Sequence, residues 1–96
     1  MQITITGFTR SEGFESDAKS LDVNTRAVLR EALTLLLTNP RAKRLRLHTL
    51  KGFGKPTIYK IDISSNKAWQ VTFELDGNTA HLKRVATHKE MDKRPR

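Results

Sequence analysis

The sequence predicts an α+β domain in which one strand and two helices precede an antiparallel meander of three to four strands. Apolar residues recur at helical spacing between residues 11 and 38, and they alternate with polar residues from residue 57 onward. The 96 residues have the length of one domain and contain no internal repeat, linker or low-complexity segment. The simplest architecture for residues 1–96 is one antiparallel sheet with both helices on one sheet face.

The N-terminal residues predict a short strand followed by a first helix. Residues 1–8 alternate between apolar and polar side chains, which is typical of a strand. Ser11 is a candidate helix cap, because its hydroxyl can accept a hydrogen bond from a backbone N–H group of the first turn. Three apolar side chains then share one helical face: Phe14, Ala18 and Leu21.

A second and stronger helix is expected over residues 25–38. Asp22 or Asn24 can cap its beginning. Its apolar set is Val28, Leu29, Ala32, Leu33, Leu35 and Leu36. Asn39-Pro40 ends it, because a residue that precedes proline avoids the helical region. Both helices are expected to serve packing, and we assign them no chemistry.

The remainder of the chain predicts strands that are separated by turns. One strand is expected to begin at Leu45, and a loop with two glycines and a proline follows at residues 51–56. Further strands are expected over residues 57–64, 69–75 and 79–87. Residues 76–78, Asp-Gly-Asn, predict a tight hairpin turn. Residues 93–96 are expected to form a mobile tail.

Alternation in these strands predicts a polar face on the side of the sheet away from the helices. The residues expected on it are Lys60, Asp62, Gln70, His81 and Lys83. Such a face is either a binding surface or an ordinary solvated sheet face.

The positive charge is concentrated after the first helix. The net charge is +8; residues 1–24 carry two basic and four acidic side chains, whereas residues 25–96 carry sixteen and six. Seven Lys or Arg residues and no acidic residue lie between Arg41 and Lys60. This field attracts phosphate backbones or an acidic protein partner. The alternative is a solvated basic face without a specific partner.

Several classes of protein are disfavoured by what the sequence lacks. It has no cysteine, which excludes disulfides, thiolate catalysis and thiolate metal sites. Its apolar runs are far shorter than the roughly 20 residues of a membrane helix, and its first residues do not resemble a signal peptide. A cytoplasmic protein without membrane association is therefore expected.

The sequence contains three histidines, His48, His81 and His88, and histidine is the side chain that transfers protons near neutral pH. No two of them have the helical spacing of a zinc protease, and no metal or other cofactor is expected. Histidine, Lys and Arg beside a carboxylate suit cleavage of RNA, in which a base activates a 2′-hydroxyl, cations hold the phosphate and an acid protonates the leaving oxygen. The same residues suit a non-catalytic RNA-binding face, so the composition leaves both readings open.

Four segments in order resemble the RelE/ParE superfamily of toxins from bacterial toxin–antitoxin systems. Residues 48–52, His-Thr-Leu-Lys-Gly, resemble the His-x-Leu-x-Gly segment of its YafQ-like branch. Residues 59–63 and 69–77 are similar to the two strands and the hairpin that follow in RelE-type toxins. Residues 84–90, Arg-Val-Ala-Thr-His-Lys-Glu, resemble the YafQ-like Arg-x-Gly-Thr-His-x-Glu ending.

The resemblance implies a small microbial-RNase-like fold of the RelE type and an endoribonuclease that cleaves mRNA on the ribosome and inhibits translation. Its expected partners are the ribosome, mRNA and a cognate antitoxin, with an acidic segment that covers the basic sheet face. Carried over by position, His48 and His88 are the acid–base candidates and Arg84 holds the scissile phosphate. Asp62 is either a base or the group that orients a histidine. Contacts to RNA phosphates are expected from Arg46, Lys51, Lys55, Lys60, Gln70, Lys83 and Lys89.

One departure from the family pattern bears on activity. Gln70 occupies a position where relatives often have an arginine, and the loss of such a charge can lower the rate by on the order of 10²-fold. Two alternatives therefore remain beside the ribonuclease. One is a ParE-like toxin that inhibits gyrase, and the other is a non-catalytic RNA- or protein-binding domain on the same fold.

Overall fold

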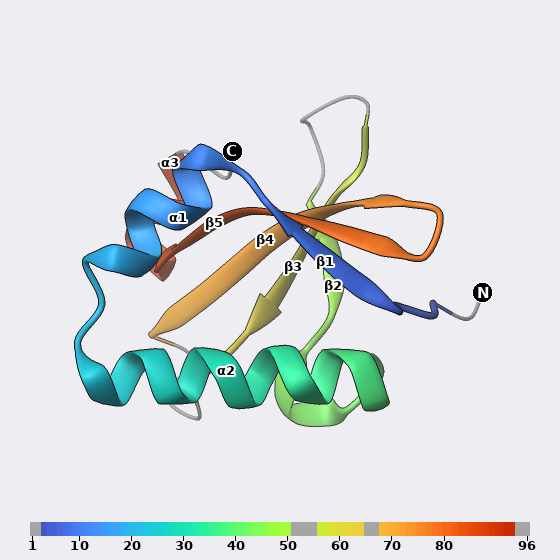
Figure 1. Ribbon diagram of the computed structural model, residues 1–96, viewed down its shortest axis with the longest axis horizontal. Coiled ribbons are helices and arrows are strands. Elements are labelled where there is room, and N and C mark those ends of the chain that lie inside the picture. The colour runs from blue at the N-terminus through green and yellow to red at the C-terminus, as the bar shows by residue number, and fades with distance from the viewer. Residues whose placement is uncertain (1–2, 51–55, 65–67, 94–96) are drawn as a thin grey trace.

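The computed structural model describes residues 3–50, 56–64 and 68–93, in which the chain forms five strands, three α-helices and a short 3₁₀ turn. The elements are β1 (Gly7–Arg10), α1 (Glu12–Lys19), α2 (Val23–Thr38), the 3₁₀ turn η1 (Lys43–Leu45), β2 (His48–Leu50), β3 (Ile58–Asp62), β4 (Trp69–Asp76), β5 (Thr79–Thr87) and α3 (His88–Lys93). Figure 1 shows α2 along the bottom of the view and α1 at the upper left. The predicted α+β class is confirmed.

The described strands form one sheet in the order β1-β5-β4-β3-β2. Strands β2 to β5 pair antiparallel with their neighbours, which confirms the predicted meander. Strand β1 instead pairs parallel with β5, with Gly7 opposite Thr79, so the prediction of a wholly antiparallel sheet is wrong. The alternation of side chains within a strand specifies its faces, whereas the partner and its direction depend on residues far away in the sequence.

The first strand also begins later than predicted. Residues 3–6 precede β1, which starts at Gly7, and residues 1 and 2 lie outside the described part of the chain. Ile5 is nevertheless buried in the core. The alternation of apolar and polar residues therefore indicated that Ile5 is buried, but it did not indicate the residue at which β1 begins.

Both helices begin at the caps that the sequence predicts. The Ser11 hydroxyl accepts a hydrogen bond from the backbone N–H of Phe14 at 3.1 Å, and the Asp22 carboxylate accepts one from that of Thr25 at 2.7 Å. Helix α2 starts at Val23, two residues before the predicted start at residue 25. Side-chain caps satisfy backbone donors that have no partner within the helix, which explains why helices start at these residues.

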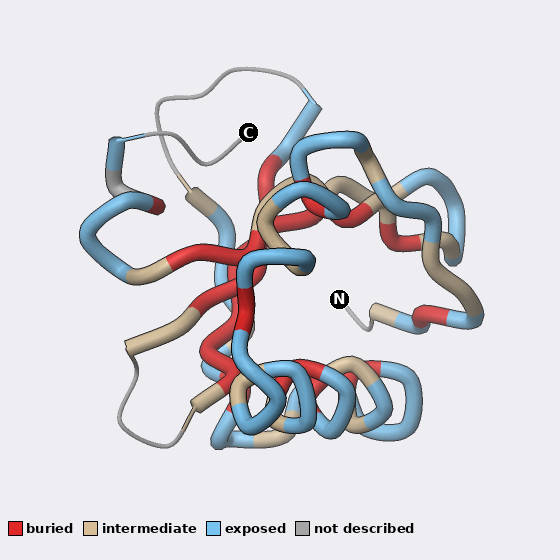
Figure 2. The backbone as a smooth tube through the Cα atoms, turned by 60° about the vertical axis from the view of Figure 1, so that its left-hand side comes forward, coloured by how far each residue is buried: buried red, intermediate tan, exposed pale blue. Residues whose placement is uncertain are grey.

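The core lies between α2 and one face of the sheet. Helix α2 contributes Leu29, Ala32 and Leu36, which are buried together with strand residues such as Val71 and Phe73. Figure 2 shows that the buried residues run through the middle of the sheet, whereas most residues of α2 are exposed. Burial of each large apolar side chain contributes about 1.5–3 kcal/mol to the free energy of unfolding.

An irregularity in the β4–β5 ladder changes the alternation that the sequence predicts for β5. Thr72 lies opposite Arg84, but Phe73 lies opposite Leu82, so Lys83 is an extra residue in β5. A β-bulge of this kind locally disrupts the period of two. His81 therefore lies opposite Glu74, and Arg84, which follows the extra residue Lys83, lies opposite Thr72.

Two elements near the ends of the meander differ from the prediction. Leu45 does not start a strand; it is the last residue of η1 and is fully buried, so its hydrophobicity reflects the core. The charged segment after β5 forms α3, in which the N–H of Glu90 bonds to the Thr87 hydroxyl and Met91 is buried. Among the described residues, no helix has the length and apolar character that crossing a membrane requires.

Candidate catalytic site

The register of four strands places a row of polar side chains on the sheet face away from α2. His48 of β2 lies opposite Lys60 of β3, Lys60 lies opposite Thr72 of β4, and Thr72 lies opposite Arg84 of β5. Residues that pair across adjacent strands point to the same face. Lys60 is only 6% exposed, so its aliphatic stem is covered by the surrounding structure.

A second row lies two residues along the strands and contains Asp62 and Gln70, which are direct partners in the β3–β4 ladder. Asp62 is 1% exposed and Gln70 is 3% exposed. Their positions confirm that Lys60, Asp62 and Gln70 share the polar face. This face is buried at its centre, so the alternative of an ordinary solvated sheet face does not describe Asp62 and Gln70.

Both carboxylate oxygens of Asp62 have partners. Nη1 of Arg46 lies 3.2 Å from Oδ2 of Asp62, and Nε2 of Gln70 donates a hydrogen bond to Oδ1 at 3.0 Å. A buried carboxylate without partners would cost several kcal/mol, so these two contacts offset the burial of the Asp62 side chain. Both oxygens of the Asp62 carboxylate are therefore occupied by protein groups and covered by the surrounding structure.

Arg46 has an unusual backbone conformation. Its φ is 48° and its ψ is 48°, which is the left-handed region, and it is the capping residue that directly follows η1. An L-residue with a side chain pays roughly 1–2 kcal/mol for this conformation, and glycine is usual at such helix ends. Its side chain is 51% exposed, so its guanidinium reaches Asp62 from the solvent side.

The carbonyl of Arg46 determines how the His48 ring is protonated. Nδ1 of His48 lies 2.6 Å from the carbonyl oxygen of Arg46. A carbonyl oxygen only accepts hydrogen bonds, so Nδ1 carries the proton. In the neutral ring, Nε2 then has a free lone pair and is available as a base.

Arg84 is engaged by a carboxylate from α1. Its Nε lies 2.5 Å from Oδ2 of Asp17 and its Nη2 lies 3.2 Å from Oδ1, and the same Oδ2 accepts a hydrogen bond from the backbone N–H of Val85 at 3.1 Å. The hydrogen bond to Asp17 raises the pKa of the Arg84 guanidinium above its usual value. The predicted role of Arg84 in holding a phosphate requires this ion pair to be shared or exchanged.

His88 and Lys89 lie at a different corner of the polar face from His48. Both are exposed at the start of α3, and the backbone N–H of His88 bonds to the carbonyl of Ala68. Strands β2 and β5 are separated by three strand spacings, about 14 Å. The structure therefore does not bring the two predicted acid–base histidines into contact.

The other predicted site residues are dispersed. The Lys83 carbonyl accepts a hydrogen bond from the Ser11 hydroxyl, so the bulge is fixed to the start of α1. Lys51 and Lys55 lie outside the described residues. His81 is bonded through Nδ1 to the Thr9 hydroxyl on β1. Within residues 3–50, 56–64 and 68–93, no group of three or more His, Asp or Glu residues is arranged to hold a metal ion.

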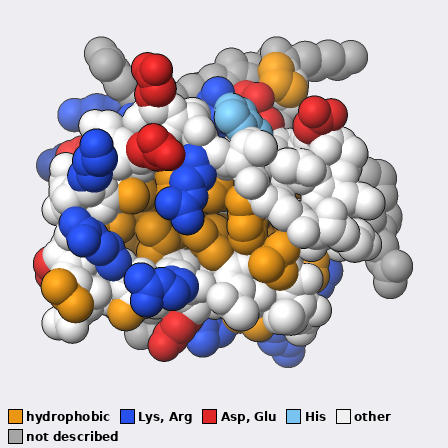
Figure 3. All heavy atoms as spheres, viewed as in Figure 1, with side chains coloured by type: hydrophobic (Ala, Val, Ile, Leu, Met, Phe, Trp, Pro, Cys, Tyr) orange, Lys and Arg blue, Asp and Glu red, His pale blue; other side chains and the backbone are white. Residues whose placement is uncertain are grey.

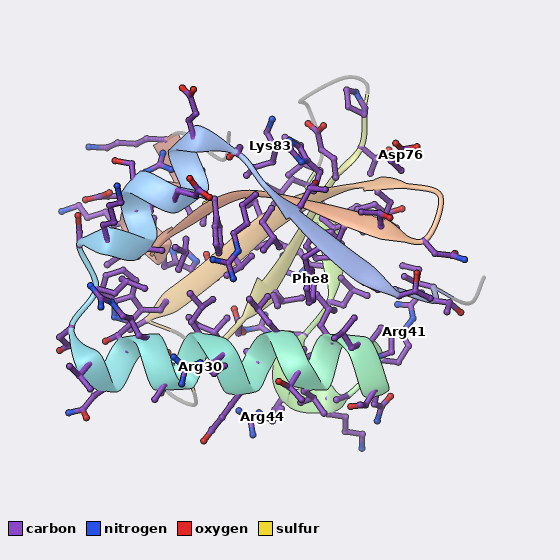
Figure 4. All side chains as sticks on the ribbon, viewed as in Figure 1. Phe8, Arg30, Arg41, Arg44, Asp76 and Lys83 are labelled. Atoms are coloured by element: carbon purple, nitrogen blue, oxygen red, sulfur yellow. The ribbon has the colours of Figure 1, made fainter. Side chains whose placement is uncertain are left out.

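A separate apolar groove opens on the helical side of the molecule, between α1, β1 and α2. Its volume is about 610 Å³, and its apolar lining includes Phe8, Phe14, Leu29, Leu33 and Leu37. Figure 3 shows these hydrophobic side chains in a hollow with basic groups around it. The basic residues of the rim are Arg10, Lys19, Arg26 and Arg30. Phe8 of β1 and Arg30 of α2 come from the two sides of this groove (Figure 4).

Sequence reasoning missed the two ion pairs that organise this part of the structure. Asp17 lies in a helix to which the sequence analysis assigns only packing, although its carboxylate binds Arg84, 67 positions away. Arg46 was expected to contact RNA, and its pairing with Asp62 was not anticipated. The basic run around Arg46 was the only local signal. Neighbouring residues in the sequence do not indicate that Arg46 pairs with the buried carboxylate of Asp62, or that Asp17 pairs with Arg84.

No model of a known protein family matches the sequence, and no curated protein is significantly similar to it. Solved structures with the same fold do exist. YafQ from Escherichia coli BL21(DE3) superposes with a TM-score of 0.70 at 19% identity, over 88% of this chain and 94% of YafQ. A metal-bound toxin from Helicobacter pylori gives 0.67 at 22% identity, over 94% and 99% of the two chains.

A third similar structure comes from a complex. RelE from the RelB–RelE antitoxin–toxin complex of Methanococcus jannaschii gives a TM-score of 0.60 at 20% identity, over 88% of this chain and 95% of that chain. These identities are low, and what the superpositions establish is the fold. The chain has the RelE/YafQ fold that the sequence segments at residues 48–52 and 84–90 led us to expect.

Proposed function

We propose that this chain, which has the fold of the RelE and YafQ toxins, is the toxin of a toxin–antitoxin system and cleaves mRNA on the ribosome in the cytoplasm. The observation that carries the proposal is the cluster on the polar sheet face, in which His48 lies beside Lys60 and bonds to the carbonyl of Arg46. This cluster combines a proton carrier with cations on a fold whose similar structures include toxins.

The chemistry required for RNA cleavage matches these groups. Nε2 of His48 would accept the proton of a 2′-hydroxyl, which then attacks the adjacent phosphorus. Lys60 and the exposed guanidinium of Arg46 would stabilise the charge that develops on the phosphate oxygens. His88 remains the candidate acid for the leaving 5′-oxygen, with the RNA spanning the face between the two histidines. The sequence resemblance supports both histidine assignments.

We expect this enzyme to be slow. Gln70 supplies no charge, and its amide is directed at Asp62. Arg84 is paired with Asp17 in the absence of substrate. Of two cations expected from the family pattern, one is therefore absent at residue 70 and the other, Arg84, is engaged by Asp17; each charge lost from the transition state costs on the order of 10²-fold in rate.

The proposed protein partner is an antitoxin that contributes an amphipathic segment with acidic residues. The groove between α1, β1 and α2 has an apolar floor and four basic rim residues, with Glu15 as its one acidic lining residue. An amphipathic helix with an apolar face and acidic flanks complements both features. This occupant differs from the expected acidic cover over the sheet face, and a partner that wraps around the molecule could contact both surfaces.

Induced expression with mapping of mRNA ends tests the function. Cuts that depend on ribosomes and follow the reading frame are the expected result. DNA damage without mRNA cuts would support the gyrase-inhibiting alternative instead. Growth arrest with intact mRNA and intact DNA would support a binding domain without catalysis.

A further inference from the structure

We propose that the ion pair between Arg46 and Asp62 sets the tautomer of His48 by holding residue 46 in its left-handed conformation. Asp62 and Gln70 would then be positioning residues, which act on His48 without contacting the substrate, and Arg46 would position His48 in addition to its proposed contact with the phosphate. The inference deepens the proposed function, because its catalytic consequence depends on that function. The tautomer itself can be measured without any assay of activity.

The contacts form a continuous path from the centre of the sheet to its edge. Gln70 donates to Asp62 at 3.0 Å, Arg46 lies 3.2 Å from the same carboxylate, and His48 bonds to the Arg46 carbonyl at 2.6 Å. The path begins at two buried side chains in β3 and β4 and ends at an exposed histidine in β2. The contacts thereby connect the rigid interior of the sheet to the imidazole ring of His48. On the exposed edge strand β2 alone, this ring would be free to rotate.

The left-handed backbone conformation of residue 46 is energetically unfavourable and must be stabilised by another interaction. It is the only non-glycine residue with positive φ among the described residues. The conformation is unfavourable for any side chain with a Cβ atom. An ion pair that forms only in this conformation offsets the cost, because Asp62 is fixed and buried and the guanidinium must come to it.

The orientation of Asp62 is itself fixed. Oε1 of Gln70 is buried and has no hydrogen-bond partner among the described residues, whereas Nε2 of the same amide faces Asp62. A flipped amide would bring its carbonyl oxygen against the carboxylate, which is repulsive. The amide therefore leaves its own oxygen without a partner while its Nε2 donates to Asp62, and this bond holds the Asp62 carboxylate in place at the centre of the path.

The consequence is a defined proton acceptor. The Arg46 carbonyl keeps the proton on Nδ1 of His48, so that the Nε2 lone pair points away from the backbone. A ring without this bond would distribute its proton between the two nitrogens and would rotate. His48 would then have its proton on Nδ1, and its Nε2 lone pair pointing away from the backbone, for only part of the time.

Nitrogen-15 NMR of the whole protein tests the proposal directly. The chain has three histidines, so the ring nitrogens of His48 can be assigned by comparison with His48→Gln. The expected result for the neutral ring is a proton on Nδ1. A predominant proton on Nε2 in the unsubstituted protein would overturn the proposal.

Substitutions at residue 46 separate the conformation from the side chain. Arg46→Ala removes the ion pair and keeps the cost of left-handed backbone, so the preference for the Nδ1 proton should fall by roughly fivefold or more. Arg46→Gly also removes the ion pair but accepts this conformation, and it should retain more of the preference. Arg44→Ala is the matched control, because Arg44 is an exposed arginine of the same 3₁₀ turn.

A double-substitution cycle completes the test. Asp62→Asn should shift the tautomer when residue 46 is arginine and should have little effect when residue 46 is glycine. Equal effects in both backgrounds, or an Arg46→Ala protein that matches Arg44→Ala, would overturn the proposal. If the tautomer responds as expected but the protein does not cleave mRNA, the positioning path stands and the proposed ribonuclease function fails.

Discussion

Oδ2 of Asp17 lies 2.5 Å from Nε of Arg84, and this contact ties α1 to β5. The same carboxylate oxygen accepts a hydrogen bond from the backbone N–H of Val85, so it binds both the side chain of Arg84 and the backbone of β5. Asp17→Ala should lower the free energy of unfolding by about 1–3 kcal/mol, because it removes the acceptor that the Arg84 guanidinium and the Val85 N–H share. Urea denaturation measures this change.

The control for Asp17 is Glu15→Ala, an exposed acidic residue on the same helix. We expect it to change the free energy of unfolding by no more than about 0.5 kcal/mol. Equal destabilisation by the two substitutions would mean that loss of an acidic charge, rather than the contact with Arg84, is responsible.

The histidines should differ in their effects on mRNA cleavage. His48→Ala and His88→Ala should each reduce cleavage by about 10²–10⁴-fold, the usual contribution of a group that transfers a proton. His81→Ala is the control, because His81 is bonded to Thr9 at the opposite end of β5 and has no proposed role. Cleavage can be measured on mRNA bound to ribosomes in vitro. An active His88→Ala protein would restrict the site to the corner that contains His48.

The cap of α2 should make stability depend on acidic pH. The hydrogen bonds from Thr25 lower the pKa of the Asp22 carboxyl below its usual value. A group whose pKa is lower in the folded protein stabilises the fold above its unfolded pKa, about 3.9, and loses this contribution as the pH falls through the folded pKa. The difference in Tm between the unsubstituted protein and Asp22→Ala should therefore be present at neutral pH and vanish in strong acid.

Asn is as good a helix cap as Asp, but it does not titrate. Asp22→Asn should accordingly keep its Tm near that of the unsubstituted protein at neutral pH. In this variant, the contribution of the cap should persist in acid. A constant difference between Asp22→Ala and the unsubstituted protein at every pH would contradict the role of the carboxylate.

Two exposed hydrophobic residues of α2 form a matched pair for testing the groove. Leu37 is 40% exposed and lines the groove, whereas Val23 is 79% exposed and lies outside its lining. Leu37→Glu should weaken binding of the cognate antitoxin by at least roughly tenfold, because it places an acidic charge where an apolar and acidic segment would dock. Val23→Glu should leave the affinity unchanged. Calorimetric titration with the purified antitoxin measures both affinities.

The sequence was most informative where structure depends on neighbouring residues. Ser11 and Asp22 cap the helices that they were expected to cap, since capping bonds span only three residues. The meander was also predictable, because each turn joins strands that are adjacent in the chain. The parallel pairing of Gly7 with Thr79 was not, because no local pattern specifies a partner so distant in sequence.

The candidate site was predicted less completely than the fold, for the same physical reason. His48, Lys60, Asp62 and Gln70 were identified as polar residues, and the register does place them on one face. The engagement of Arg84 by Asp17 depends on how α1 packs against β5, and the sequence does not show this packing. Nor does it show the left-handed backbone at Arg46, because arginine has no preference for that conformation.

The parallel pairing of β1 with β5 has a consequence for the order in which the sheet assembles. Thr9 and His81, which bond across this pair, are 72 residues apart. During synthesis β1 has no partner until β5 has left the ribosome, whereas β2 to β4 can pair as they emerge. Contacts over such separations close large loops and form slowly. Strand β1 therefore acquires its sheet partner only when β5, residues 79–87, is available, although β1 precedes the other described strands in the sequence.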